Sequence, residues 1–276
     1  MSFPLRKTAP SALFRVFPNR MNLRLATLFG ALVMAVVNPV RADVADEIIA
    51  KARSHLGSES ALDAISTIHF TGTLEMVDPQ PKADGKAPSS DRLEKMPVEI
   101  IFQKPYQQKM VVNRSALIDV TVLDDYDGWA RITDRTNSKK WKITLLDAEQ
   151  IKQLRANTWE NLHFFAGIDK RGGSVKVGGD VAVDEVDCVK LSFYHSDRIV
   201  FHRYFEKSSG RLVKTETSSG GEIREEGEMV VDGVRFPKVI INKSASGQSS
   251  RMTIEKVVLN EKIPATEFAV PSLAAD

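Results

Sequence analysis

The chain has 276 residues, with 38 Lys and Arg against 36 Asp and Glu, and it is 42% hydrophobic. This composition is that of a folded protein and excludes a disordered, a collagen-like or a multi-span membrane protein. The positive excess lies at the start, because residues 1–42 hold six basic side chains and no acidic one. The remaining 234 residues carry 32 basic and 36 acidic side chains, and this slightly acidic body argues against a nucleic-acid partner.

The start of the chain has the pattern of an export signal. Basic residues precede the uncharged apolar run Leu25–Val37, which is too short to cross a bilayer comfortably. We expect cleavage between Ala42 and Asp43, which leaves residues 43–276 as a single exported domain in the periplasm. Met21 is an alternative start, and an uncleaved membrane anchor is the alternative to a cleaved signal.

Two helices and a first strand are predicted next. Residues 43–56 have helical spacing and end at Gly57, and residues 58–65 form a second, shorter helix. Residues 67–77 alternate apolar and polar side chains, as a half-buried strand does. Residues 78–97 contain four prolines and no aromatic residue, so we predict a flexible loop there.

Short β-rich runs separated by turn residues fill most of the remaining chain, and one helix interrupts them. This helix begins after the N-cap Asp147, with Gln150 three residues further on. The strands before it are predicted at 98–103, 107–113, 118–123, 128–133 and 141–146. Those after it span 175–270, with hairpin turns at 178–179, 208–210, 220–221, 232–233 and 246–247.

Consecutive strands at this spacing predict one antiparallel meander in a mainly β protein with some α-helix (α+β). A sheet of this width must curl or close, and the region around Phe201 is apolar at both strand parities. We therefore predict a curved sheet that forms an unclosed β-barrel, with the helices as a lid or plug. The composition gives no sign of a second domain, and we expect a monomer.

Candidate chemistry is sparse. The common nucleotide-binding, metalloprotease and serine-hydrolase motifs are absent from the sequence, and no cofactor is expected. His195, His202 and Asp197 sketch a metal or catalytic cluster, but a metal site needs three or four converging ligands, and strand parity is as likely to separate the two histidines as to bring them together. We therefore predict no metal site and no enzyme. The run Asp124–Asp127 lacks the ligand series of a calcium loop and is predicted to be a solvated turn.

Two further features have alternative interpretations. Cys188 is the only cysteine and has no identifiable base partner, so we expect a buried structural thiol. The acidic strand around residues 222–228 is predicted to be a solvent-facing or edge strand protected by its charge, and the alternative is a docking patch for a basic partner.

Several segments together resemble the LolA-like family of outer-membrane lipoprotein-sorting proteins, which shares its fold with LolB- and RseB-type proteins. They are FQKPYQQKMVV (102–112), DDYDGWARI (124–132), CVKLSFYHSDRIVFHRYFEKSSGRLVKTE (188–216), GEMVVDGVRFPKVI (227–240) and TIEKVVLNEKIPATEFAVPS (253–272). The resemblance implies an unclosed barrel with a helical lid over a cavity for acyl chains. In the family's carrier, an arginine before the strand-linking proline latches the lid, and Lys104 occupies that position here.

We therefore predict a non-enzymatic periplasmic carrier or binder of acylated lipoproteins or another hydrophobic ligand, with a membrane-bound donor or acceptor protein as a further partner. An RseB-like lipid or lipoprotein sensor is the alternative, and a sealed apolar core is the alternative to an open cavity. The predicted cavity residues are apolar and inward-facing: Phe70, Leu74, Ile100, Phe102, Met110, Val112, Val120, Val122, Trp129, Trp159, Phe165, Phe193, Phe201, Phe205, Phe236 and Ile254.

Overall fold

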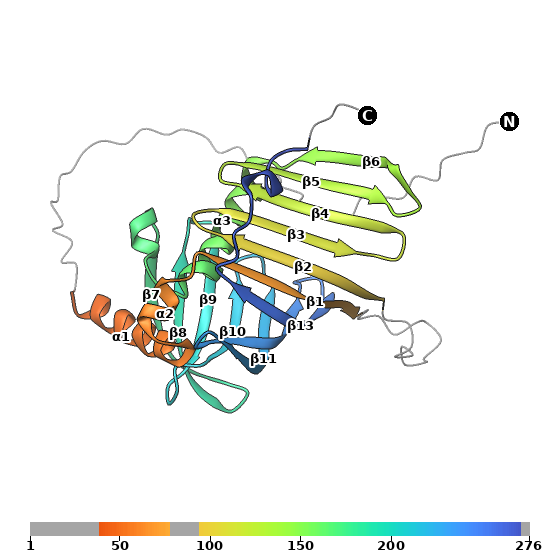
Figure 1. Cartoon of the computed structure of the whole chain (residues 1–276). Coiled ribbons are helices and arrows are strands. Elements are labelled where there is room, and N and C mark those ends of the chain that lie inside the picture. The colour runs from red at the N-terminus through yellow and green to blue at the C-terminus, as the bar shows by residue number, and fades with distance from the viewer. Residues whose placement is uncertain (1–38, 78–93, 272–276) are drawn as a thin grey trace, which may run out of the picture. The chain divides into compact units, whose positions relative to one another are not determined.

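A computed structural model describes residues 39–77 and 94–271, which form a 13-stranded antiparallel sheet with helices packed against it (Figure 1). The helices are α1 (Pro39–Leu56), α2 (Glu59–Asp63) and α3 (Ala148–His163). The strands are β1 (Thr67–Val77), β2 (Lys95–Gln103), β3 (Gln107–Asn113), β4 (Leu117–Asp124), β5 (Asp127–Asp134), β6 (Asn137–Leu145), β7 (Ser174–Val183), β8 (Val186–Tyr194), β9 (Val200–Glu206), β10 (Leu212–Thr217), β11 (Glu222–Val231), β12 (Val234–Lys243) and β13 (Ser249–Leu259).

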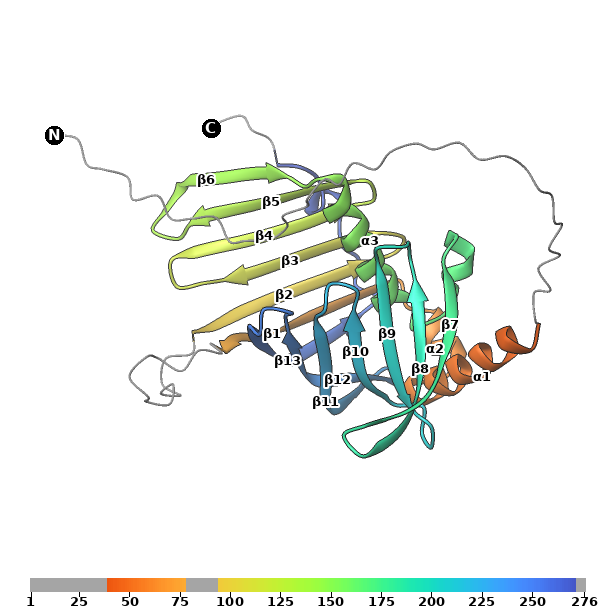
Figure 2. The ribbon, with the colours of Figure 1, turned by 180° about the vertical axis from the view of Figure 1, so that it is seen from behind.

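The sheet is a meander whose first and last strands meet in its middle. The order is β6-β5-β4-β3-β2-β1-β13-β12-β11-β10-β9-β8-β7, so β6 and β7 are the edges. Helix α3 connects these two edge strands, and both views of the ribbon place it between β2–β4 and β9 (Figures 1 and 2). The predicted fold, a curved, unclosed antiparallel sheet with a helical lid, is confirmed.

The pairing of β1 with β13 depends on a glycine. The register shifts between Thr71 and Gly72, and the two backbones approach closely at this bulge. A Cβ atom on Gly72 would lie 2.0 Å from the carbonyl oxygen of Thr253. Only glycine fits there, because every other residue would place a carbon inside the neighbouring strand.

Local sequence signals explain the helices. Asp147 caps α3 by accepting a hydrogen bond from the Gln150 backbone nitrogen, and the Gln150 side chain accepts one from the Asp147 nitrogen. Ser58 caps α2, and α1 ends at Leu56, next to Gly57, as predicted. No helix among the described residues is long and apolar enough to cross a membrane.

Three sequence predictions need comment. The predicted loop 78–97 is wrong at its end, because residues 95–97 pair with β1 as the start of β2, and residues 78–93 lie outside the described part. The predicted turn at Gly178–Gly179 is wrong: these residues form a bulge inside β7, and the β7–β8 turn is at Asp184–Glu185. Helix α1 runs through the predicted cleavage position between Ala42 and Asp43, and cleavage stays a prediction.

The sheet buries apolar side chains on both faces. Its inner face, defined here as the face that packs on the helices, contributes to two clusters with α1, α2 and α3. On its outer face, a third cluster forms around Val122 and Trp129, with Phe268 from the C-terminal segment. A fourth forms around Cys188 and Tyr204, and Cys188 is fully buried and free, as expected.

Candidate functional site

A cavity of about 290 Å³ lies on the inner face of the sheet, between the strands and α3. Most of its wall is apolar, and it comes from strands far apart in the sequence. Phe70 lies at its centre, with ring centroids 6.3 Å from Phe102 and 5.8 Å from Phe236. The apolar lining residues are Leu56, Ile68, Phe70, Ile100, Phe102, Phe164, Phe165, Phe201, Leu212, Ile223, Phe236, Pro237, Ile240, Met252 and Ile254.

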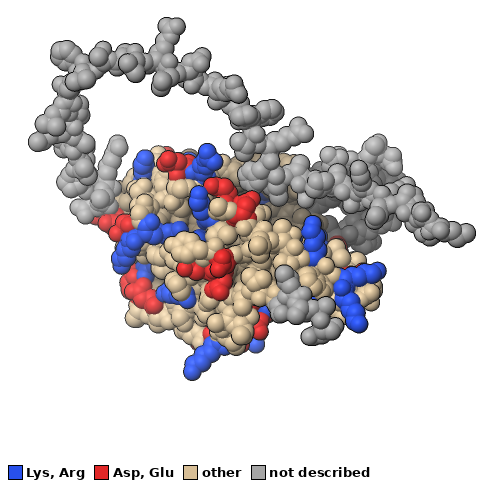
Figure 3. Space-filling model, turned by 90° about the horizontal axis from the view of Figure 1, so that it is seen from above, with Lys and Arg blue, Asp and Glu red and all other residues tan. Residues whose placement is uncertain are grey.

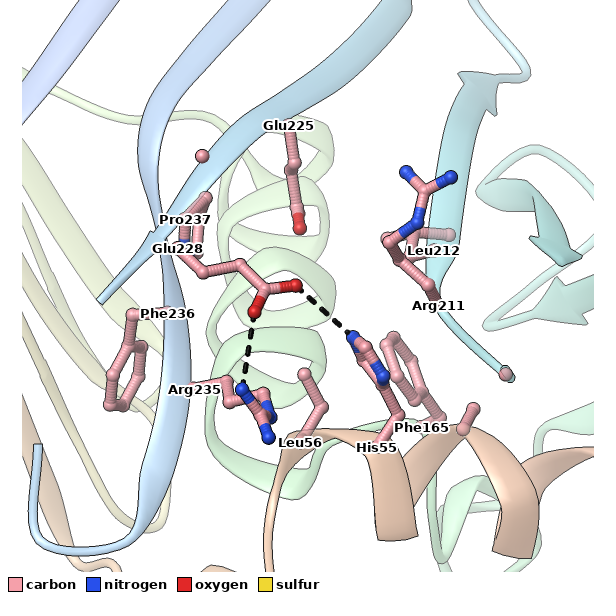
Figure 4. A pocket seen from close by; sticks show the side chains of 13 residues that line it. His55, Leu56, Phe165, Arg211, Leu212, Glu225, Glu228, Arg235, Phe236 and Pro237 are labelled. Carbon is pink, nitrogen blue, oxygen red and sulfur yellow. Dashed lines mark hydrogen bonds and ion pairs between the residues drawn. The ribbon is translucent and has the colours of Figure 1, made fainter. Parts of the chain in front are cut away.

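A second pocket of about 210 Å³ shares part of this wall and leads to α1. It lies where β11 separates from β10: the two strands pair at Thr215↔Ile223 and Glu216↔Glu222, after which β11 continues along β12. Figure 4 shows this mouth, with His55 on one side and Glu225 above it. Glu228 bridges the mouth, 3.4 Å from His55 and 3.2 Å from Arg235.

Three charged or polar groups form a buried network beside the cavity. Arg203 lines the cavity from β9 and donates through Nη1 to Glu160 of α3, and His195 contacts the other oxygen of that carboxylate. Burial opposes ionisation of Glu160, but Arg203 and His195 outweigh it and hold the pKa of this carboxyl below its usual range. The network ties α3 to β9 through charge.

The Arg203 guanidinium is also surrounded by aromatic rings. Its Cζ atom lies 4.8 Å from the Phe165 ring centroid and 5.0 Å from that of Phe193. A guanidinium at these distances is attracted to the ring faces. The rings and Glu160 therefore hold the arginine in a fixed place in the cavity wall.

Glu225 differs from these groups because it has no hydrogen bond or ion pair within the described residues. It lines both the cavity and its mouth, and in Figure 4 its side chain points into the pocket. The surrounding protein partly desolvates the Glu225 side chain, which raises the pKa of its carboxyl group. The positive charge of Arg203 lowers this pKa, but by less. This environment favours the protonated acid more than water does.

Only some of the predicted cavity residues line this cavity. Those that line it are Phe70, Ile100, Phe102, Phe165, Phe201, Phe236 and Ile254. Phe193 and Phe205 are packed in the neighbouring inner cluster, and Leu74, Met110 and Val112 belong to the cluster around Phe70. Trp159 stacks on His163 with the ring centroids 3.4 Å apart, away from the lining.

Three predicted cavity residues lie on the opposite face. Val120, Val122 and Trp129 belong to the outer cluster, and the Trp129 Nε1 donates to the carbonyl oxygen of Phe268 at 3.1 Å. The prediction that they face the cavity is wrong, because the β3–β4 register places Thr121 and not Val122 opposite Met110. Val120 and Val122 alternate with Asp119 and Thr121, so the sequence groups the two valines on one face but does not show which face of the sheet borders the cavity.

The helices are held together by a residue that the sequence analysis missed. Arg53 of α1 is buried and donates to the carbonyl oxygens of His163 and Phe164 at 2.9 and 3.2 Å, where α3 ends. It also pairs with Glu59 and with Asp63 of α2. Lys104, the predicted latch, lies 3.5 Å from the Asp63 carbonyl oxygen, so its contact is with α2 and is long for a hydrogen bond.

The other polar side chains that the sequence analysis considered as metal or catalytic groups lie apart from one another. His195 contacts Glu160, whereas His202 contacts Ser192 at 2.8 Å on the outer side of its strand. Among residues 39–77 and 94–271, no group of three or more His, Cys, Asp or Glu side chains is placed to hold a metal ion. Asp125 forms the predicted β4–β5 turn, where it pairs with Arg155 of α3.

The acidic strand β11 lies inside the sheet, so the edge-strand interpretation is wrong, whereas Glu225, Glu226 and Glu228 are exposed, as the solvent-facing interpretation predicts. Its carboxylates divide between the two faces: Glu225 and Glu228 line the mouth, and Glu226 lies 3.1 Å from Arg251. On the molecular face seen in Figure 3, acidic and basic side chains are interspersed and form no single basic stripe.

Comparison with known proteins supports the fold. No protein-family model matches the chain, and no curated protein sequence does. A LolA superfamily protein from Nitrosomonas europaea is similar in structure, with a TM-score of 0.53 and 14% identity over 82% of this chain and 97% of that one. A DUF1329 family protein from Desulfovibrio piger is similar too, with a TM-score of 0.51 and 8% identity over 82% of this chain and 97% of that one. The chain therefore has the LolA-like fold that its sequence predicts.

Proposed function

We propose that this protein is a periplasmic, non-enzymatic binder or carrier of an acyl chain, which it holds in the inner cavity. The acyl chain belongs to a lipoprotein or to another hydrophobic ligand, and a membrane-bound protein supplies or receives it. The observation that carries this proposal is the apolar cavity, which is lined by strands from both parts of the sheet and covered by α3. The predicted export signal and the LolA-like fold support it.

An acyl chain that leaves a membrane needs an apolar cavity wall to replace the lipid around it. Each methylene that leaves a membrane loses about 0.8 kcal/mol of apolar burial, so a single long acyl chain needs compensation of roughly ten kcal/mol. Phe70, Phe102, Phe236, Met252 and Ile254 supply a continuous apolar surface for it. The pocket beside α1 supplies an exit for the rest of the ligand.

An RseB-like sensor would need a surface that binds a protein partner. The candidate for that surface from the sequence is the acidic strand around residues 222–228. In β11, Glu226 is paired with Arg251, and Glu225 and Glu228 line the cavity mouth. This arrangement favours the binder or carrier over the sensor.

Two matched variants test the proposal. Ile240 lines the cavity, whereas Val239, the preceding residue of β12, faces the other side of the sheet. Ile240→Trp should fill the cavity and weaken uptake of a fluorescent acyl probe at least tenfold, and Val239→Trp should leave uptake unchanged. Native mass spectrometry of residues 43–276 from the periplasm should show a bound acyl species. A mass without ligand, together with no uptake by the wild type, would contradict the proposal.

A further inference from the structure

The inner cavity is lined by eight polar residues besides its apolar ones: Asn157, Glu160, Asn161, Arg203, Thr215, Glu225, Arg235 and Asn242. Arg203 donates through Nη1 to Glu160, and its Nε is buried without a hydrogen-bond partner among the described residues. The Glu225 side chain also has no partner there; it is exposed at the mouth and points into the pocket. A buried donor without a partner costs free energy, so Arg203 needs a reason to face the cavity.

The sheet register brings the two groups to the same region. Arg203 lies opposite Thr215 on β10, and Thr215 lies opposite Ile223 on β11. Glu225 is two residues beyond Ile223 and therefore on the same face. Neighbouring strands are about 4.8 Å apart, so Arg203 and Ile223 are separated by roughly 10 Å, and Glu225 lies about 7 Å further along β11, where this strand leaves β10. Both residues line the cavity, and the charge of Arg203 acts on the Glu225 carboxyl group, so a small polar group of a ligand has room between their long side chains.

We propose that Arg203 and Glu225 bind the acyl carbonyl group of the ligand, with the chain running from there along Phe70 and Phe102. This inference rests on the proposed function and names the chemical class of its ligand: an amphiphile with one acyl group, either as a free carboxylic acid or as an acyl ester or amide.

The chemistry of the two groups is complementary to a carbonyl. A guanidinium donates hydrogen bonds, and an acyl oxygen accepts them. Desolvation raises the pKa of Glu225, and in its protonated form Glu225 is a second donor whose side chain points into the pocket. Because Glu225 lines both the cavity and its mouth, a head group held there leaves the chain inside and any attached molecule outside.

Glu225 is the residue to change, because removal of Arg203 would leave the buried Glu160 without its guanidinium. Glu225→Leu removes the carboxyl group of Glu225 and leaves the Arg203–Glu160 pair intact. Glu225→Gln replaces the carboxyl group with an amide, which can still donate a hydrogen bond. Glu226→Leu is the matched control, since Glu226 lies next in β11 and contacts Arg251 away from the cavity lining.

The experiment measures displacement of the neutral dye N-phenyl-1-naphthylamine by lauric acid, methyl laurate and dodecane. We expect the wild type and Glu226→Leu to bind at least one of the acyl probes about tenfold more tightly than dodecane, as two hydrogen bonds of about threefold each, one from Arg203 and one from Glu225, would give. Glu225→Leu should reduce this preference to less than about threefold, and Glu225→Gln should retain most of it. Preference for the acid over the ester indicates a free carboxylate, and equal binding indicates the carbonyl of a larger acylated molecule.

Two results would overturn the inference in different ways. If dodecane binds as well as both acyl probes, the cavity holds hydrocarbon without recognising the carbonyl. If Glu225→Leu keeps the full preference, the carbonyl is recognised without Glu225. Either result overturns the inference, and the proposed function survives. If none of the three compounds displaces the dye or binds in a direct titration, both the inference and the proposed function are wrong.

Discussion

Both faces of the sheet bury apolar side chains, more on the inner face than on the outer one, and the two faces differ in what covers them. On the outer face, the chain's own C-terminal segment covers the cluster with the fully buried Phe268, and an open pocket of about 450 Å³ lined by Val120, Trp129 and Val270 lies beside it. On the inner face, α1 and α3 cover the strands but leave a cavity with Arg203 and Glu225 in or near its wall. The comparison shows that an apolar strand face predicts burial, and that only the covering element decides between core and binding site.

The largest expected effect is on the outer face. Phe268→Ala removes a fully buried ring from the seal and should lower the free energy of unfolding by about 3–5 kcal/mol, as large-to-small core substitutions do. Urea denaturation measures this loss. Val270→Ala in the same segment is the control, because Val270 is exposed and should change stability little. If Phe268→Ala is fully folded but no longer binds the acyl probe, the outer face takes part in binding, and the distinction between the two faces is wrong.

The next effect concerns the cover of the inner face. Arg53→Met removes the donors that satisfy the carbonyl oxygens of His163 and Phe164, and it should destabilise the protein by about 2–3 kcal/mol. Amide hydrogen exchange should accelerate most in the last turn of α3. Arg53→Lys keeps the charge but lacks the planar set of donors, so it should recover only part of the loss. Uniform acceleration over the whole sheet would contradict a role at the helix end.

A smaller effect is the pH dependence due to Glu225. Burial raises its pKa in the folded protein, so the folded state holds this proton more tightly than the unfolded state. Its contribution to stability is present at low pH and is lost as the pH rises through the folded-state pKa. Glu225→Gln should therefore remove a decline in stability with rising pH that Glu226→Gln preserves. Identical pH profiles for the two variants would show that Glu225 is hydrated like its neighbour.

The smallest effect comes from His163, which stacks on Trp159 at the end of α3. Burial lowers the pKa of His163 to about 4, so below its usual value near 6.5 the unfolded chain binds a proton that the folded state does not. Stability should fall as the pH drops from about 6.5 to 4. His163→Phe keeps an aromatic ring and should flatten this part of the profile, measured by urea denaturation at each pH. If His163→Phe loses stability with falling pH as steeply as the wild type, this pH dependence comes from other groups.

The sequence predicted most elements because local patterns determine them. The alternation in 67–77 and the capping pair Asp147 and Gln150 lie within short windows, and both are confirmed. The pairing of β1 with β13 depends on contacts between distant residues, and no local pattern reveals that Gly72 permits it.

The candidate site was predicted less completely. Phe102 and Phe201 were placed correctly on the inner face, but Val122 and Trp129 were not, because alternation groups side chains on one face without showing which face of the sheet borders the cavity. Arg203 carried a usable signal, since it occupies the inward position between Phe201 and Phe205. Glu225 and Arg53 could not be recognised, because their environments are assembled from separate elements.

The most direct test of the account is to locate a bound chain by anomalous X-ray diffraction from crystals grown with 12-bromododecanoic acid. The account predicts a bromine atom on the inner face, near Phe70 and Phe102, with the carboxyl group at Arg203 and Glu225. A bromine atom on the outer face near Trp129, or an inner cavity that stays empty at saturating ligand, would contradict it.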